Sequence, residues 1–276
     1  MDSLWPKNSF YDAVVVGAGI AGLYMLYELR EVGLSCQVVE AGADLGGTWY
    51  WNRYPGARCD TYSMEYSYSF CSKLEQEWEW SERYPNQSEI LKYLNHVADR
   101  FELRSNIRFN TRLLAANFSE KKDQWNLDLD TGNQLICRFL LMATGCFSIP
   151  NTLDIPGSST FKGAIYHTSH WPKNEVCLSN QTVGVIGNGS SGVQIISELA
   201  KQAKKLIIFQ RTAQYAVPSG NCSLDSKEVE LIKSDYSGFR DRNRQQSSAQ
   251  LSGTKTSQRS ALSVSPDNRK RLYEGN

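Results

Sequence analysis

Two glycine-rich hexapeptides are the stretches of this chain best suited to chemistry. Residues 17–22 (GAGIAG) and residues 187–192 (GNGSSG) each follow a short run of β-branched residues. A helix-forming segment and a further apolar run come next in both cases, which is the context that makes a GxGxxG pattern informative. The glycines let a strand turn tightly into a helix, whose N-terminus favours a pyrophosphate. Both hexapeptides are therefore predicted to bind dinucleotides.

The residues that end the two units differ in charge. Glu40 lies 18 residues after Gly22. Arg211 lies 19 residues after Gly192, at the equivalent place. Glu40 can accept hydrogen bonds from ribose hydroxyls but would repel a 2′-phosphate. The guanidinium of Arg211, beside the Thr212 hydroxyl, matches a phosphate. The first site thus suits the adenosine half of FAD or NAD, and the second suits NADPH.

Hydrophobic patterning predicts the elements that position these motifs. The expected fold class is α/β, with two dinucleotide-binding domains made of Rossmann-like βαβ units and parallel sheets, and a helical C-terminal segment. One helix is predicted at 87–103, and another from the second motif to about Lys205. A further amphipathic helix is predicted to carry Val229, Ile232, Tyr236 and Phe239. Strands are predicted at residues 11–16, 35–40, 113–118, 125–129, 139–143, 182–186 and 206–210.

Composition excludes several classes of protein. The 276 residues are 41% hydrophobic, so a disordered chain is not expected. Because 30 basic residues balance 29 acidic ones, the strongly basic surface of a nucleic-acid-binding protein is not expected either. No uninterrupted apolar run is long enough for a membrane span, and the first residues lack the features of a secretory signal. The seven cysteines show neither a CxxC pair nor zinc spacing. We therefore expect reduced thiols, no metal site and a cytoplasmic location.

Two longer stretches make a resemblance specific. Residues 46–60 (GGTWYWNRYPGARCD) resemble the flavin-contacting stretch of type I Baeyer–Villiger monooxygenases. Residues 161–172 (FKGAIYHTSHWP) fit the FxGxxxHxxxW fingerprint of that family and lie between the two glycine motifs, as they do there. The likeness extends from about Tyr11 onward, and phenylacetone- and cyclohexanone-type enzymes are the most similar. The fingerprint residues are Phe161, Gly163, His167 and Trp171.

The resemblance implies a role for individual residues. FAD would lie on Gly17, Gly19 and Gly22, with Glu40 at its ribose. Asp60 matches an active-site carboxylate that orients an arginine in the family, and this sequence has no counterpart of that arginine. His167 matches a linker residue that couples domain movement to NADPH oxidation, which we favour over a general-base role. Thr48, Trp49, Asp60 and Tyr66 would line the flavin. NADPH would be bound by Gly187, Gly189, Ser190, Ser191, Gly192, Arg211 and Thr212.

The role of Arg58 stays open, because its side chain could reach the nicotinamide or form an ordinary surface ion pair.

The activity that the resemblance implies is FAD- and NADPH-dependent insertion of one atom of O₂ into a ketone, through a C4a-peroxyflavin, to give an ester or lactone. Two alternatives stay open. One is an N- or S-oxygenating flavin monooxygenase. The other is a catalytically incomplete nucleotide-binding half that needs a partner chain.

Domain boundaries follow from the resemblance and from changes in composition. Residues 1–150 are expected to be the first half of the FAD-binding domain, and residues 151–175 the linker. Residues 176–222 would begin the NADPH-binding domain. Residues 223–276 would form a helical, partly mobile segment, in which Ser265 and Pro266 start a last helix close to the final residue. We therefore expect a chain truncated to the N-terminal half of the family.

Overall fold

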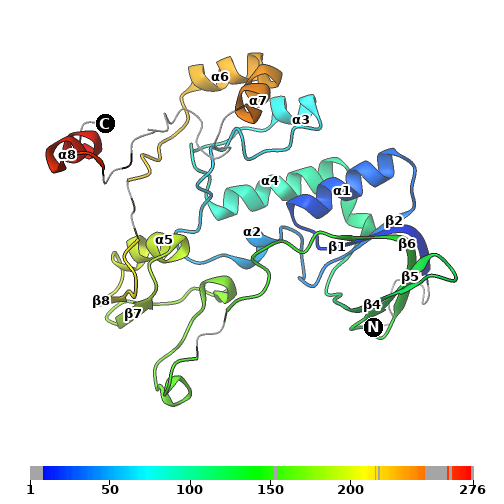
Figure 1. Cartoon of the computed structure of the whole chain (residues 1–276), viewed down its shortest axis with the longest axis horizontal. Helices are drawn as coiled ribbons and strands as arrows, with labels where there is room; N and C mark the ends of the chain where they lie inside the picture. The colour runs from blue at the N-terminus through cyan, green and yellow to red at the C-terminus, as the bar shows by residue number, and fades with distance from the viewer. Residues whose placement is uncertain are drawn as a thin grey trace.

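The computed structural model describes residues 9–151, 154–214, 216, 218–245, 260 and 263–274. Two sheets of unequal size organise these residues (Figure 1). The larger sheet has six strands in the order β3-β2-β1-β6-β5-β4, and the smaller pairs β7 with β8. The strands are β1 (Ser9–Val16), β2 (Cys36–Val39), β3 (Ile107–Arg108), β4 (Leu113–Ser119), β5 (Gln124–Leu129), β6 (Gln134–Met142), β7 (Thr182–Ile186) and β8 (Lys205–Phe209).

The first βαβ unit lies at the centre of the six-stranded sheet. β1 runs parallel to both β2 and β6. Successive side chains of a strand point to opposite faces, so Val15 joins one core cluster while Val14 joins another. Helices α1 (Ile20–Glu31) and α4 (Gln87–Arg100) cover the Val15 face, as Figure 1 shows. Burial of Ala13, Val14 and Val15 explains why the second half of β1, residues 13–16, is a continuous apolar run.

α4 shows how the sequence specifies one of these helices. Apolar side chains recur at Ile90, Leu94 and Val97, and all three are buried against the main core. The side chain of Asn86 caps the helix by accepting a hydrogen bond from the Glu89 backbone N–H. The predicted helix over 87–103 is confirmed as far as Arg100, and Leu103 begins a separate 3₁₀ turn, Leu103–Asn106.

The larger sheet is mixed rather than parallel throughout. β5 runs antiparallel to β6, and β4 antiparallel to β5. A tight turn containing Gly132, whose φ is +76°, connects β5 to β6. β6 also begins at Gln134, five residues earlier than the predicted strand over 139–143, because it pairs with β1 from Ser9 onward. The α/β class is confirmed, and the antiparallel strands are an addition to it.

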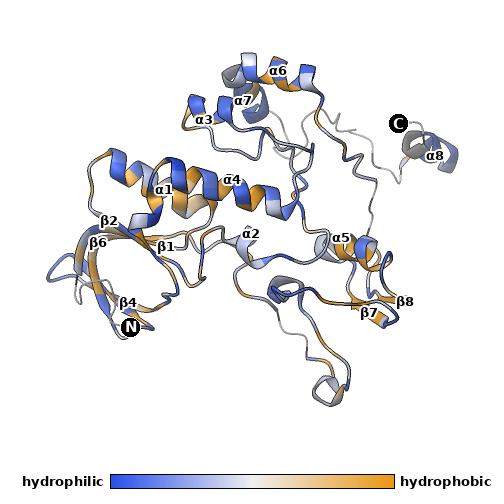
Figure 2. Ribbon diagram, turned by 180° about the vertical axis from the view of Figure 1, so that it is seen from behind, coloured by the Kyte–Doolittle hydropathy of each residue, from blue (hydrophilic) through white to orange (hydrophobic). Residues whose placement is uncertain are grey.

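The second βαβ unit is smaller and more exposed. α5 (Ser190–Leu199) packs Ile195 and Leu199 against an apolar cluster. The helix ends before the predicted Lys205, because Lys205 already pairs with Thr182 as the first residue of β8. Figure 2 shows apolar colour on β7, β8 and α5. Two residues of these strands, Ile186 and Phe209, are exposed.

The C-terminal helices return to the first unit. The single amphipathic helix predicted around Ile232 and Phe239 is instead two, α6 (Ser226–Ser234) and α7 (Tyr236–Arg244). Asp235 interrupts them because its side chain accepts a hydrogen bond from the Gly238 N–H and so caps α7. α8 (Pro266–Glu274) begins where the sequence predicted. Within the segment 223–276, which was predicted to be partly mobile, residues 246–259 lie outside the described residues.

α7 is anchored by Arg240. Its guanidinium forms an ion pair with Glu75 at 3.2 Å and donates hydrogen bonds to the carbonyl oxygens of Glu65 and Ser67. Glu75 belongs to α3 (Ser72–Glu77), which lies beside α6 and α7 in both views (Figures 1 and 2). None of the helices in these described ranges combines the length and apolarity that a membrane crossing requires.

Candidate functional site

The first glycine motif forms a turn between two carboxyl ends of parallel strands. Gly17 donates its N–H to the carbonyl oxygen of Val39 at 2.8 Å, and Ala143 donates to Val16 at 2.9 Å. A Cβ atom added at Gly22 would lie 1.8 Å from the carbonyl oxygen of Gly17. The first turn of α1 is therefore pressed directly onto the strand end. Gly19 precedes the helix with no side chain capping it.

Glu40 is held at the end of β2 by the same turn. One carboxylate oxygen accepts the N–H of Ala18 at 2.7 Å, and the other accepts the N–H of Gly42 at 2.6 Å. The residue is only 5% exposed. Because a carboxylate offers about four lone-pair positions, each oxygen keeps capacity for another donor such as a ribose hydroxyl. The carboxylate is thus preorganised beside the glycine turn.

A second loop crosses over the glycine turn and carries aromatic residues with it. Gly46 donates its N–H to the Ala18 carbonyl at 2.9 Å, and Gly47 lies against Gly19. The short helix α2 (Thr48–Trp51) follows at once. The indole N–H of Trp49 donates to the Tyr66 hydroxyl at 3.0 Å. Thr48, Trp49 and Tyr66 are therefore gathered near the first motif, with Thr48 exposed.

Asp60 lies beside this aromatic pair and is exposed. Burial raises the pKa of Tyr66 to about 12, and the charges of Cys59 and Asp60 add to the rise.

Arg58 is bound to a different part of the first unit. Its guanidinium forms an ion pair with Glu82 at 3.0 Å and donates to the Tyr84 carbonyl at 2.9 Å. The ion pair that the sequence left open for Arg58 is therefore present, and contact of this residue with a nicotinamide stays a prediction.

The second glycine motif repeats the geometry of the first. Gly187 has φ +97° and donates its N–H to the Phe209 carbonyl at 2.9 Å. A Cβ atom at Gly192 would lie 2.5 Å from the carbonyl oxygen of Gly187. Gly189 precedes α5, again without a side-chain cap, and Ser190 begins the helix. Ser191 is half-buried and forms a hydrogen bond with Tyr54 of the first unit.

Arg211 and Thr212 follow β8 directly and are exposed. They occupy the place that Glu40 holds in the first unit, after the second strand of the βαβ pattern. Asn188 and Gln210 tie the glycine turn to this strand end, since the Asn188 amide donates to Gln210 Oε1 at 2.8 Å. An exposed guanidinium beside the turn is suited to an incoming phosphate.

The fingerprint residues of the linker differ in how deeply they are buried. Phe161 is exposed, and its ring lies against Gly163, where an added Cβ would be 2.5 Å from the ring. The His167 Nδ1 accepts the N–H of Ser169 at 3.2 Å, so its ring caps a short 3₁₀ turn, Thr168–His170. Trp171 is half-buried in the cluster between the two units. His167 itself is exposed, and its role as a linker residue stays a prediction.

Comparison with known proteins decides the family. The family model for pyridine nucleotide-disulphide oxidoreductases matches residues 14–230, which include both glycine motifs and the linker. The chain belongs to the pyridine nucleotide-disulphide oxidoreductase family.

Within that family the similarity to Baeyer–Villiger monooxygenases is confirmed. A Baeyer-Villiger monooxygenase of Pseudooceanicola batsensis is 42% identical over 96% of this chain and 48% of its own length. Phenazine N-monooxygenase PhzNO1 of Lysobacter antibioticus is 41% identical over 97% of this chain and 49% of its own. The NADP⁺-bound structure of cyclohexanone monooxygenase from Rhodococcus sp. Phi1 superposes with a TM-score of 0.90 at 39% identity, covering 98% of this chain and 50% of that one. The chain spans about half the length of the curated relatives it matches.

The residues present fit the two cofactors of a pyridine nucleotide-dependent flavoprotein. The cradle at Gly17 and Gly22 leaves no room for a side chain, and Glu40 presents a carboxylate beside it. At the second motif Gly192 likewise leaves no room for a side chain, Gly187 has a positive φ, and Arg211 follows at the strand end. Backbone N–H groups at two helix N-termini are the donor set that a pyrophosphate requires.

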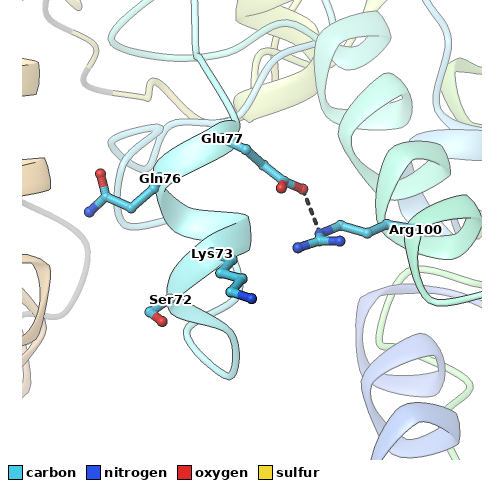
Figure 3. A pocket seen from close by; sticks show the side chains of 5 residues that line it. All are labelled: Ser72, Lys73, Gln76, Glu77 and Arg100. Carbon is cyan, nitrogen blue, oxygen red and sulfur yellow. Dashed lines mark ion pairs between the residues drawn. The ribbon is translucent and has the colours of Figure 1, made fainter.

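A separate pocket of about 440 Å³ lies between α3 and α4, away from both glycine motifs (Figure 3). Its lining side chains are Ser72, Lys73, Gln76, Glu77 and Arg100, and Glu77 forms an ion pair with Arg100 at 2.6 Å. The ion pair between Glu77 and Arg100 connects the two helices beside this pocket. The pocket gathers none of the predicted site residues.

Sequence reasoning missed the residues that join the two units. Gln194 of α5 hydrogen-bonds to Tyr54 and Arg58 of the first unit, and Asn221 hydrogen-bonds to Glu82. Gln194 lies two residues after the second motif, where the spacing alone does not say which way a side chain faces. Tyr54 lies within the stretch 46–60 that carried the resemblance, which was the one available signal.

Proposed function

We propose that this chain supplies the cofactor-binding part of an FAD- and NADPH-dependent monooxygenase that inserts one oxygen atom of O₂ into a ketone, giving an ester or lactone. The observation that supports it most is the pairing of two glycine turns whose strands end in opposite charges, Glu40 and Arg211. The resemblance of residues 46–60 and 161–172 to Baeyer–Villiger monooxygenases points to the ketone branch. When bound, the flavin would supply hydride acceptance from NADPH and activation of O₂.

Each residue in the proposal has a stated task. Gly17, Gly19 and Gly22 would admit the FAD pyrophosphate, and Glu40 would bind its ribose. Trp49 and Tyr66, fixed by their mutual hydrogen bond, would shape the flavin side with Thr48 and Asp60 next to them. The NADPH pyrophosphate would lie at the start of α5, on Gly187, Gly189, Ser190, Ser191 and Gly192, with its 2′-phosphate on Arg211 and Thr212.

Two finer proposals accompany this function. The seven cysteines form no disulfide bonds, which supports a location in the reducing cytoplasm. The separation of the two sheets by the linker supports the boundaries 1–150, 151–175, 176–222 and 223–276. Participation of a completing partner chain stays a prediction.

The test begins with an absorption spectrum of the purified chain after reconstitution with FAD. We expect a flavin band that bleaches on anaerobic addition of NADPH and returns with O₂, followed by ester formation from ketones. Formation of N-oxides or sulfoxides from amines or sulfides, with ketones unchanged, would favour the heteroatom alternative. A chain that binds no FAD would contradict the proposal for this chain alone and favour the incomplete-half alternative.

The cofactor preference has a test of its own. Arg211→Ala is expected to weaken NADPH binding by about 1.5–3 kcal/mol, the contribution of a charged hydrogen bond, and to leave NADH binding nearly unchanged. Titration of both nucleotides against the wild-type and variant chains measures the difference. Equal weakening of the two nucleotides would contradict the assignment of Arg211 to the 2′-phosphate.

A further inference from the structure

Gln194 is one of the polar side chains through which the two nucleotide units meet. Gln194 lies in α5, one turn after the second glycine motif begins the helix. Its amide Nε2 donates to the carbonyl oxygen of Arg58 at 3.0 Å, while its Oε1 accepts the N–H of Arg58 at 3.4 Å. The Tyr54 hydroxyl donates to the same Oε1 at 2.8 Å. An amide is suited to this contact because it is a donor and an acceptor at once.

The main chains of the two units also approach closely beside this contact. Gly56 has φ +81°, and a Cβ atom there would lie 2.7 Å from the Gln194 carbonyl oxygen. The same Cβ would lie 3.0 Å from the Cγ atom of Glu198, one helical turn later. At Gly56 the loop over residues 54–60 therefore lies directly against the main chain of α5.

Apolar side chains complete the contact. Tyr54 and Ala57 are buried in one cluster with Ile195 and Leu199 of α5. Trp171 of the linker packs against the same cluster. The cluster thus draws on the first unit, the linker and the second unit together. The Gln194 side chain is half-buried beside this cluster, and hydrogen bonds that are partly shielded from water are electrostatically stronger than exposed ones.

The other end of the loop is tied to the first unit. The Arg58 guanidinium forms its ion pair with Glu82 and donates to Tyr84. Glu82 in turn accepts hydrogen bonds from Asn86 at 3.1 Å and from Asn221. Arg58 is thus held by its main chain to α5 and by its side chain to the first unit. Asp60, beside Tyr66, lies two residues further along.

We propose that Gln194 is a positioning residue that fixes the segment 54–60 to the second nucleotide unit, so that the placement of α5 sets the placement of Asp60 at the flavin side. The contact itself is independent of the activity. Its effect on hydride transfer rests on the proposed function. Gln194 does not itself touch a reacting atom and acts through the loop that it holds.

Hydrogen–deuterium exchange of the full chain tests the contact. Gln194→Glu removes the donor to the Arg58 carbonyl, and Gln194→Leu removes both donor and acceptor. We expect peptides that cover 54–60 to exchange at least tenfold faster in both variants, with β1 and α1 unchanged. Ser197→Ala, on an exposed position of the same helix, is the matched control and is expected to leave exchange unchanged.

A milder variant guards against general unfolding. Tyr54→Phe removes only the hydroxyl that donates to Gln194 Oε1, and we expect about threefold faster exchange over 54–60. Wild-type protection of this segment in Gln194→Glu and Gln194→Leu would overturn the proposal. Faster exchange spread equally over β1 and α1 in all three variants would also overturn it, because the side chain would then serve stability in general.

The second readout is the rate of flavin reduction at saturating NADPH. We expect Gln194→Glu to lower this rate at least tenfold, with FAD affinity within twofold of the wild-type value. An unchanged rate together with faster exchange would overturn the positioning role and leave a purely structural contact. A wild-type chain without NADPH-dependent flavin reduction would contradict the proposed function alone, and the exchange result would still decide whether Gln194 fixes the segment.

Discussion

The two βαβ units share a turn and differ in what surrounds it. In the first unit the glycine turn is enclosed by β2, β6 and the crossing loop at Gly46, and Glu40 is buried among backbone donors. In the second unit β7, β8 and α5 flank the turn, and Arg211 is exposed. The same local sequence pattern therefore operates in a rigid core in one case and at a surface in the other.

This difference teaches that the glycine motif specifies the turn and the neighbouring strands specify its stability. The two glycine clashes have the same origin, since the third glycine of each motif faces the carbonyl oxygen of the first. The two clashes differ in how far the neighbouring residues can move to relieve them. Packed interiors resist displacement, whereas an exposed helix and a two-stranded sheet can shift.

The largest expected effect comes from adding one methyl group at this third glycine. Gly22→Ala places a Cβ 1.8 Å from the Gly17 oxygen, and Gly192→Ala places one 2.5 Å from the Gly187 oxygen. We expect losses in the free energy of unfolding of about 3 kcal/mol for the first and about 1–2 kcal/mol for the second, measured by urea denaturation. Gly189→Ala, with open space around it, is the control and should change stability by less than about 0.5 kcal/mol. Equal losses at Gly22 and Gly192 would break the comparison.

An intermediate effect is expected from the two strand-end charges. Glu40→Gln puts an amide N–H against one of two backbone donors, at Ala18 or Gly42, and so leaves a buried donor unsatisfied. We expect a loss of about 1–3 kcal/mol in the free energy of unfolding, from thermal or urea denaturation.

Arg211→Gln is the matched change in the second unit. Because the side chain is exposed, its effect on stability should stay within about 0.5 kcal/mol. A stability loss at Arg211 as large as that at Glu40 would show that the second strand end is also part of a packed network.

The smallest expected effect concerns pH at the junction of the units. Burial alone would raise the pKa of Glu82, but hydrogen bonds from Arg58, Asn221 and Asn86 outweigh it and hold this pKa below its ordinary value. A carboxyl group with a lowered folded-state pKa stabilises the fold above its unfolded pKa of about 4.3, and that contribution is lost as pH falls through the folded pKa. Glu82→Gln should therefore flatten the decline in thermal stability below about pH 4.5. An identical decline in wild type and variant would remove Glu82 from the acid response.

How much the sequence could predict depends on the range of the interactions involved. The glycine turns, the strands β1, β2, β7 and β8, and helix α4 follow from local periodicity and were predicted. The antiparallel course of β4 and β5 was not, since strand direction is set by pairing with distant partners. The division at Asp235 was also missed, because the apolar spacing of Ile232 and Phe239 is compatible with one helix or with two.

The sequence by itself determined the two dinucleotide turns and the opposite charges that end them, because these depend on residues fewer than 25 apart and on the conformational freedom of glycine. Only the tertiary structure decided where the side chains between the units go. In the folded chain Arg58 forms an ion pair with Glu82, and Arg240 forms one with Glu75. The Gln194 amide donates a hydrogen bond to the 54–60 loop. Each contact joins residues that are adjacent only after the chain has folded, and a single sequence carries no spacing that encodes them.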